Sequence, residues 1–177
     1  MRGMRLAASC SLVLLVALSL LTTPTVRGER FGGSSKLSAK AGQGSGLIEV
    51  APTAEEPLNP DGVRTFHVQG TANIRGAFAD ASYRVARAVD LSDIGTPDGV
   101  CPALGAMSPG WRPVSGLLNT SAEGAGALHF EIAPPPPTRF VSGVTFDVQW
   151  QVIKVNADES LDASQELRSE CFTVTVK

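Results

Sequence analysis

Apolar and polar residues alternate with a period of two along most of the chain after Val63. The clearest run is Val144–Val152, in which every second residue is apolar and the residues between are polar. Such alternation is typical of a β-strand that packs one face against a core. Shorter runs of the same kind occur at Phe66–Ile74, Tyr83–Val89, Leu128–Ile132 and Phe172–Val176. No stretch of this region keeps a helical stripe for three turns, so the sequence predicts an all-β domain.

Turn-forming residues separate these runs. The tripeptide Pro-Asp-Gly occurs at Pro60–Gly62 and at Pro97–Gly99, where proline presets one dihedral angle and glycine permits a positive φ. With a segment near Trp111–Leu118 and a short one at Leu47–Val50, about seven strands are expected. This pattern resembles immunoglobulin-like and fibronectin-like domains. We therefore expect an antiparallel immunoglobulin-like or fibronectin-like β-sandwich of about seven strands.

Residues 1–28 have the composition of a secretory signal peptide. Arg2 and Arg5 precede an apolar run, Leu6–Leu21, and the small residues Val26 and Gly28 provide a cleavage site. The run is shorter than the roughly 20 residues that a spanning helix needs, so we expect cleavage after Gly28 and no stable membrane insertion. Retention as an anchor is the alternative. The mature protein is expected to be secreted and extracellular, or periplasmic or in the cell envelope if the source is bacterial.

Residues 29–62 differ in composition from the rest of the mature chain. They are rich in glycine, serine, alanine and proline and offer few side chains to bury. This composition favours a flexible arm, with Leu47–Val50 as a short edge strand. The β-sandwich domain is then expected to span residues 63–177.

Two cysteines remain after the signal, because Cys10 lies within it. An exported chain favours a disulfide between Cys101 and Cys171, and two unpaired thiols are the alternative. On the loop-entropy model, such a bridge stabilises the folded chain by about 4 kcal/mol. Cys101 lies in a proline-rich and glycine-rich loop, and Cys171 has the parity opposite to the apolar residues that follow it. The bridge is therefore expected at a sheet margin or on the outer side.

The charge of the mature chain disfavours polyanionic partners. Of 15 basic residues, Arg2, Arg5 and Arg27 leave with the signal, so twelve remain against 17 acidic ones. A nucleic-acid-binding surface usually shows a basic stripe, and none occurs here. We expect no nucleic-acid partner and no attraction to an anionic lipid surface.

The sequence lacks the motifs of common catalytic sites. It has no G-x-S-x-G elbow and no P-loop, and both His67 and His129 lie at polar positions of their strands, as solvated imidazoles would. We therefore expect no enzyme and no cofactor. The alternative is a small secreted enzyme, or a calcium-binding domain that uses loop residues.

The segment Asn156–Asp162 resembles the start of a calcium-binding loop. Its oxygen-bearing residues have the spacing of the first four ligand positions, although Leu161 replaces the required glycine. A solvated acidic loop between the last two strands explains the segment equally well. The candidate metal ligands are Asn156, Asp158, Ser160 and Asp162.

Two surface features point to recognition. Trp111 and Arg112 follow Cys101 in a loop that a disulfide would restrain, and tryptophan is enriched at binding hot spots. The alternative is that Trp111 fills the end of the core. Asn119 begins a glycosylation sequon that matters if the source is a eukaryote. The sequence thus predicts a secreted, non-catalytic binding or structural module for an extracellular protein or a carbohydrate.

Overall fold

The structure, a computed structural model, describes residues 32–54, 66–133 and 140–177. Within these ranges the chain forms ten strands and no helix, so the predicted all-β class is confirmed for them. The strands are β1 (Gly33–Ala41), β2 (Ser45–Ala54), β3 (Phe66–Arg75), β4 (Ser82–Val89), β5 (Arg112–Pro113), β6 (Leu118–Asn119), β7 (Gly126–Ile132), β8 (Thr145–Val155), β9 (Leu161–Ser169) and β10 (Phe172–Thr175). The described residues include no helix with the length and apolar character needed to cross a membrane. The predicted signal peptide lies outside these ranges.

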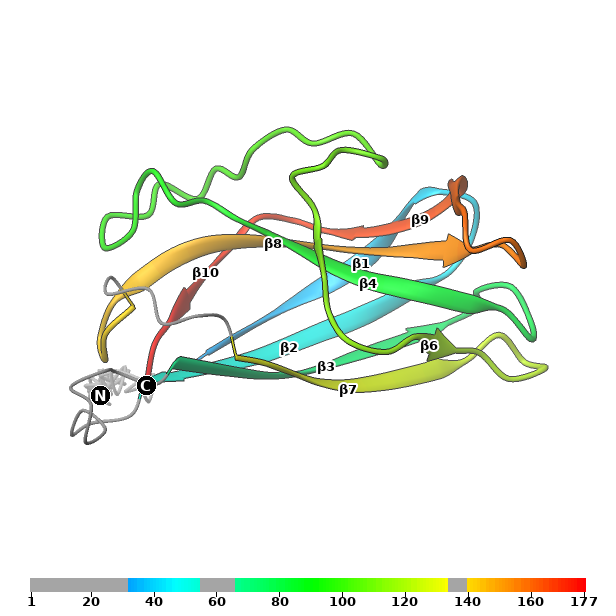
Figure 1. Cartoon of the computed structure of the whole chain (residues 1–177), viewed down its shortest axis with the longest axis horizontal. Coiled ribbons are helices and arrows are strands. Elements are labelled where there is room, and N and C mark those ends of the chain that lie inside the picture. The colour runs from blue at the N-terminus through cyan, green and yellow to red at the C-terminus, as the bar shows by residue number, and fades with distance from the viewer. Residues whose placement is uncertain (1–31, 55–65, 134–139) are drawn as a thin grey trace, which may run out of the picture.

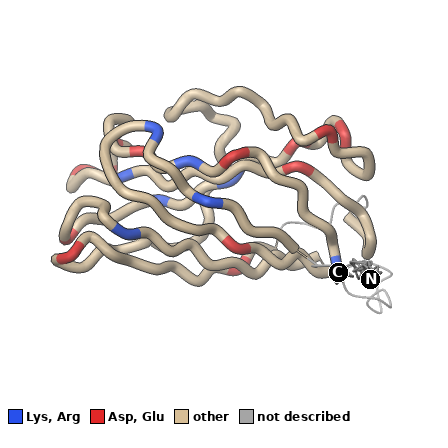
Figure 2. The backbone as a smooth tube through the Cα atoms, turned by 180° about the vertical axis from the view of Figure 1, so that it is seen from behind, with Lys and Arg blue, Asp and Glu red and all other residues tan. Residues whose placement is uncertain are grey.

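All ten strands belong to one continuous antiparallel sheet. Its order is β5-β4-β8-β9-β1-β2-β3-β7, with β10 paired to β8 and β6 paired to β4. The sheet curls into a half-barrel, as Figure 1 shows from the front and Figure 2 from behind. The expected sandwich of about seven strands is therefore not confirmed. Short alternating runs fit a sandwich and a curled sheet equally well, because both bury one face of each strand.

The predicted flexible arm is wrong for residues 33–54. These residues form β1 and β2, and β1 lies inside the sheet between β2 and β9. Its sequence, GSSKLSAKA, contains a single large apolar residue, Leu37, which is fully buried. Backbone hydrogen bonds to two neighbouring strands hold β1 in the sheet, so it needs few apolar side chains. Its sequence therefore lacks the alternating apolar pattern that predicts a strand. β9 also differs from the prediction, because its first residues were expected in a loop.

The inner face of the half-barrel holds the main core. Alternate residues of β8 point inward, and Trp150 among them packs on Phe130 of β7 with ring centroids 5.1 Å apart. Gly70 of β3 stands directly opposite Phe130 in the register. A Cβ at Gly70 would lie 2.3 Å from the Phe130 ring, so this glycine makes room for it. The period of two predicted for β8 is confirmed.

The half-barrel is closed at one end. There β6 pairs with β4, and the turn after β6 leads directly into β7. The Thr120 hydroxyl accepts a hydrogen bond from the Ala81 amide at 2.9 Å and lies 2.6 Å from the Phe78 carbonyl. At the other end β7 pairs only with β3 among the described strands, and the sheet stays open.

A loop covers the outer face of β4 and β8 (Figure 1). We call residues 90–111 the covering loop; it connects β4 to β5. Its Leu104 packs with Trp111 on Ala86 and Ala88 of β4. The side-chain amide of Gln151 donates to the Ala106 carbonyl at 2.9 Å. Asp147 and Gln151 on the polar side of β8 are therefore buried beneath a second layer, whereas Thr145 and Gln149 are half-buried.

Candidate binding cavity

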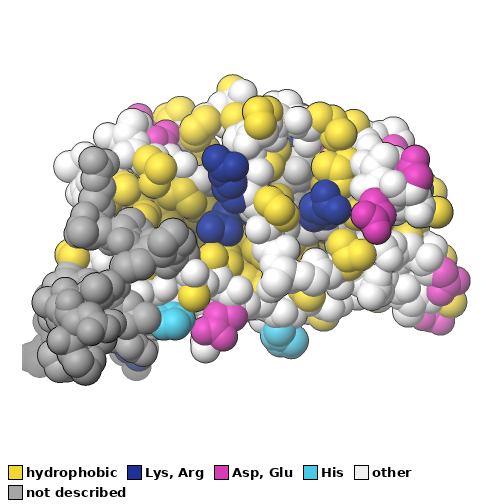
Figure 3. Space-filling view, in the orientation of Figure 1, with side chains coloured by type: hydrophobic (Ala, Val, Ile, Leu, Met, Phe, Trp, Pro, Cys, Tyr) yellow, Lys and Arg dark blue, Asp and Glu magenta, His cyan; other side chains and the backbone are white. Residues whose placement is uncertain are grey.

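The open end of the half-barrel contains a cavity of about 390 Å³. This volume is near the small end of the range of roughly 300–1,000 Å³ typical of small-molecule sites. Figure 3 shows hydrophobic side chains gathered beside Lys and Arg side chains on the face seen in Figure 1. The lining residues are Val50, Pro52, Phe66, Val68, Arg87, Val89, Leu91, Gly110, Arg112, Ile132, Phe140, Phe146, Val148, Trp150 and Val174. Most of these described lining residues are thus aliphatic or aromatic.

Three nitrogen-bearing side chains of the lining lie in one row across three strands. Arg112 of β5 is the register partner of Arg87 of β4, and Arg87 is in turn the partner of Trp150 of β8. Directly opposed residues point to the same face of a sheet, with Cβ atoms about 5 Å apart. We call Arg112, Arg87 and Trp150 the donor row. The register therefore places three donor-bearing side chains side by side among the residues that line the cavity.

The donors of this row lack partners among the described residues. No described acidic residue pairs with Arg87 or Arg112. Partial burial, and to a lesser extent repulsion from Arg112, lowers the pKa of the Arg87 guanidinium. Trp150 is 1% exposed, and its Nε1 finds no acceptor in the described part of the chain. A buried N–H is normally satisfied, so the Trp150 indole is an unpaired donor within a side chain that lines the cavity.

The donor row marks the border between packed core and cavity. On one side, the neighbouring pair Val85 and Val152 is fully buried in the core. On the other side, Val89 and Val148 form the next inward-facing pair, and both line the cavity. Beyond them, the Phe140 ring stacks on the Phe66 ring and meets the Phe146 ring edge-on, with centroids 4.8 Å apart in each pair. The cavity therefore has a polar boundary and an apolar interior.

The structure separates the two residues predicted to bind a ligand. Trp111 is 8% exposed, and its indole nitrogen donates to the Gly105 carbonyl at 2.9 Å. The Arg168 guanidinium covers the Trp111 ring at 5.1 Å. Trp111 thus fills the layer under the covering loop. Arg112 is exposed and belongs to the donor row.

The calcium-like segment forms a tight hairpin turn between β8 and β9. The Asn156 amide donates to the Ser160 carbonyl, and Glu159 takes a positive φ of 64°. The Ser160 hydroxyl bonds to Asp158 at 2.6 Å, and the Ser164 hydroxyl bonds to Asp162 at 2.6 Å. These hydrogen bonds lower the pKa of both carboxyl groups. The oxygens of the turn are thus engaged with neighbouring side chains.

The two histidines lie apart on the outer side of the sheet. His67 Nδ1 is 3.2 Å from Glu131, whereas His129 Nδ1 is 2.9 Å from the Thr71 hydroxyl. Because His129 is opposite Thr71 in the register, four residues separate it from His67 along the strands, or about 13 Å. This spacing disfavours a shared metal or a catalytic pair.

Asn119 is exposed on β6 and accepts a hydrogen bond from Ser82.

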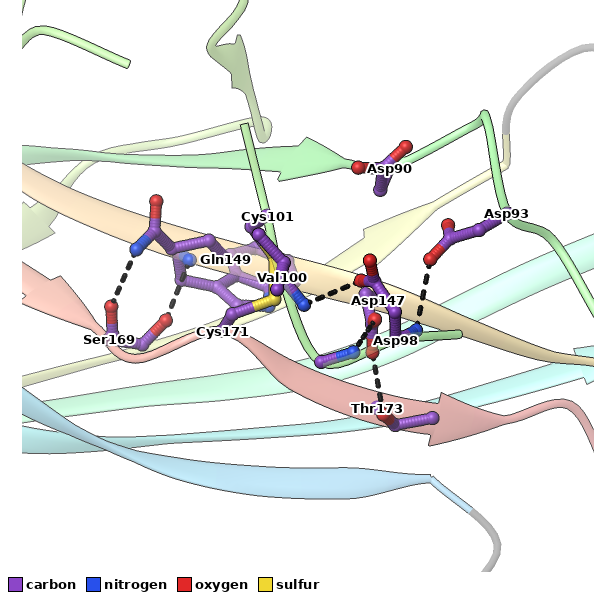
Figure 4. Close-up of a disulfide and its surroundings, with 12 residues drawn as sticks. Asp90, Asp93, Asp98, Val100, Cys101, Asp147, Gln149, Ser169, Cys171 and Thr173 are labelled. Carbon is purple, nitrogen blue, oxygen red and sulfur yellow. Dashed lines mark hydrogen bonds between the residues drawn. A yellow bond between two sulfur atoms is a disulfide. The ribbon is translucent and has the colours of Figure 1, made fainter. Parts of the chain in front are cut away.

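The predicted disulfide between Cys101 and Cys171 is confirmed, with the Cα atoms 5.5 Å apart. It joins the covering loop to the segment between β9 and β10 on the outer side, as expected (Figure 4). Next to it, Asp147 is fully buried and accepts hydrogen bonds from the Gly99 amide and the Thr173 hydroxyl. The bridge and this carboxylate together hold the covering loop to the sheet.

Asp93 and Asp98 approach Asp147 in the same region. One carboxylate oxygen from each of the three lies within 4.8 Å of the others. Carboxylates in this arrangement are the ligand type that hard cations prefer. Two of the three also serve the loop itself, because Asp93 accepts from the Asp98 amide and Asp98 accepts from the Val100 amide. The cluster therefore has a structural role in shaping the covering loop.

One residue in the sequence, Arg87, carries a signal for the donor row. Arg87 has the same parity as Tyr83, Val85 and Val89, which place their side chains on the inner face. A charged residue at a core-facing position is uncommon without a partner. The charge of Arg87 at a core-facing position could therefore have predicted a cavity beside it. The pairing of Arg87 with Trp150 needs the strand register, which a single sequence does not supply.

Neither a known protein-family model nor any curated protein sequence matches this chain.

Proposed function

We propose that this chain is a non-catalytic binding module that holds a small apolar ligand in the open end of its half-barrel. The observation that carries the proposal is the cavity of about 390 Å³ with its mainly aliphatic and aromatic lining. Apolar cavities with a few converging polar groups are the usual form of small-molecule sites. Burying an alkyl chain there removes its apolar surface from water, which favours binding.

Secretion is part of the same proposal. A disulfide between Cys101 and Cys171 is compatible with an extracellular or other oxidising compartment. The chain before the described residues has the composition of a signal peptide. A module of this kind would act outside the cytoplasm, on a ligand taken from the surrounding medium or from a partner. Recovery of the intact chain from culture medium or envelope extracts, with its N-terminus at Glu29, tests this part.

Tryptophan fluorescence gives a direct test of the cavity. The chain has two tryptophans, and Trp150 lines the cavity whereas Trp111 does not. A Trp111→Phe variant therefore leaves a single reporter. Titration with decanol and dodecanol, below the concentrations at which they aggregate, is expected to change Trp150 emission saturably at one site. Affinity should rise by about fourfold per methylene until the cavity is full.

A cavity-filling variant provides the control. Val89 lines the cavity, so Val89→Phe should abolish the fluorescence change, whereas Leu47→Phe on the exposed side of β2 should leave it intact. Thermal unfolding of each variant confirms that it is folded. Absence of saturable binding by every alkyl probe to the folded Trp111→Phe chain would contradict the proposed function.

A further inference from the structure

We propose that the ligand of this cavity is an amphiphile with one apolar chain and an anionic oxygen head group, and that the donor row binds the head. This inference rests on the proposed function and names the class of ligand for the same site. It has three independent supports: the alignment of Arg112, Arg87 and Trp150, the lack of anionic partners within the described ranges, and the apolar wall on one side of the row.

The first step concerns charge. Two guanidinium groups from directly opposed positions share one cavity wall, and no described acidic side chain pairs with either. Like charges directly opposite each other destabilise a sheet. An anion between them would remove that repulsion and replace lost hydration. Guanidinium groups bind carboxylate and phosphate oxygens with two parallel hydrogen bonds, which makes these head groups the best match.

The second step concerns the indole of Trp150. Its N–H is buried, has no acceptor in the described chain, and belongs to a side chain that lines the cavity next to Arg87. An indole nitrogen can donate a hydrogen bond but cannot accept one. A ligand oxygen at the donor row would satisfy it. A purely apolar ligand would leave this donor without a partner.

The third step concerns orientation. Valines that are fully buried in the core adjoin the donor row on one side, so a ligand chain cannot extend that way. On the other side the lining continues through Val89 and Val148 to the Phe140 and Phe146 rings. A ligand with its head at the row would therefore place its chain over these residues. The row fixes the position of the head, and the apolar wall accepts a single chain.

The experiment compares head groups on one chain length in the Trp111→Phe background. The probes are dodecanoate, dodecyl phosphate, dodecanol and dodecylammonium, all below their aggregation concentrations. We expect both anions to bind at least about tenfold more tightly than dodecanol, because each forms charge-assisted hydrogen bonds with the donor row. Dodecylammonium should bind most weakly. The ratio between dodecanoate and dodecyl phosphate distinguishes a carboxylate from a phosphate head.

Variants of the two arginines test whether the donor row causes the difference in affinity between dodecanoate and dodecanol. Arg87→Gln and Arg112→Gln should each weaken dodecanoate by about tenfold and leave dodecanol unchanged. Arg84→Gln is the matched control, because Arg84 lies on the same strand but does not line the cavity, and it should change neither. In a ¹⁵N spectrum, the Trp150 indole N–H should shift downfield with dodecanoate and not with dodecanol.

The outcomes separate the two proposals. If dodecanol binds at the cavity and the anions bind no better, or if both arginine variants bind dodecanoate normally, the cavity is a binding site but the head-group inference is wrong. If no probe binds, the proposed function is wrong as well. Arg112 is exposed, so its variant should fold even if Arg87→Gln does not, and it keeps the test decisive.

Discussion

Gly70 shows how one residue shapes the inner face of the sheet. It interrupts the apolar alternation of β3, and its missing side chain is the space that the Phe130 ring occupies. Phe130 in turn packs on Trp150, which lines the cavity. A glycine in a strand normally weakens it, so its presence here has to be offset by the packing that it permits.

Substitution of Gly70 by alanine should therefore destabilise the fold. The new Cβ would lie 2.3 Å from the Phe130 ring and would force that ring, and Trp150 with it, to move. We expect a loss of about 1–3 kcal/mol in the free energy of unfolding, measured by urea denaturation. Gly105→Ala is the matched control, because no atom lies within 4 Å of its added Cβ. Equal stability of the two variants would show that Phe130 is not confined at this position.

Trp111 makes a comparable contribution on the outer face. Its ring packs on Ala86, Ala88 and Leu104 and lies beneath the Arg168 guanidinium. Trp111→Ala should cost about 3 kcal/mol of unfolding free energy, as truncation of a buried aromatic side chain does. Met107→Ala in the same loop should have little effect, since Met107 is 58% exposed. A stable Trp111→Ala variant that had lost a partner would instead restore the recognition role predicted from the sequence.

Sequence patterns predicted the individual elements to different degrees. The runs that became β3, β4, β7, β8 and β10 were found because each has an apolar face. β1 and β9 were missed, because most of their buried contacts are made by backbone and polar groups. In β9, Glu166 is buried through bonds to Gln151 and Arg168, which no hydrophobic pattern reveals. The disulfide was predictable from a count of cysteines, whereas the donor row depends on the register.

The position of β1 gives a prediction at the scale of the element. Leu37 is 1% exposed and points into the core, whereas Ser38 is exposed on the same strand. Leu37→Ala should lower the unfolding free energy by about 2–5 kcal/mol, while Ser38→Ala should change it by less than about 0.5 kcal/mol. A flexible arm would tolerate both substitutions equally. Chemical denaturation of the two variants therefore tests whether residues 33–41 form part of the sheet.

Two layers of different character make up the whole molecule. The inner face is an apolar core that ends in a cavity, and the outer face of β4 and β8 carries a polar layer under the covering loop. In that layer Glu166 accepts from Gln151 and Arg168, and Arg168 also donates to the Leu104 carbonyl at 2.6 Å. Leu91 and Gly110, near the two ends of the loop, line the cavity. The covering loop is thus part of both layers.

The disulfide is the covalent link between the covering loop and the sheet. It closes a sequence separation of 70 residues, so its loss should lower the free energy of unfolding by about 4 kcal/mol on the loop-entropy model. Cys101→Ser, Cys171→Ser and the double variant can be compared by urea denaturation under reducing conditions. Because either substitution alone removes the same bridge, all three variants should lose the same stability relative to the oxidised chain. If the losses of the two single variants add up in the double variant, each cysteine stabilises the fold separately. If the loss is below about 1 kcal/mol, the hydrogen bonds of Asp147 and Arg168 suffice to hold the loop.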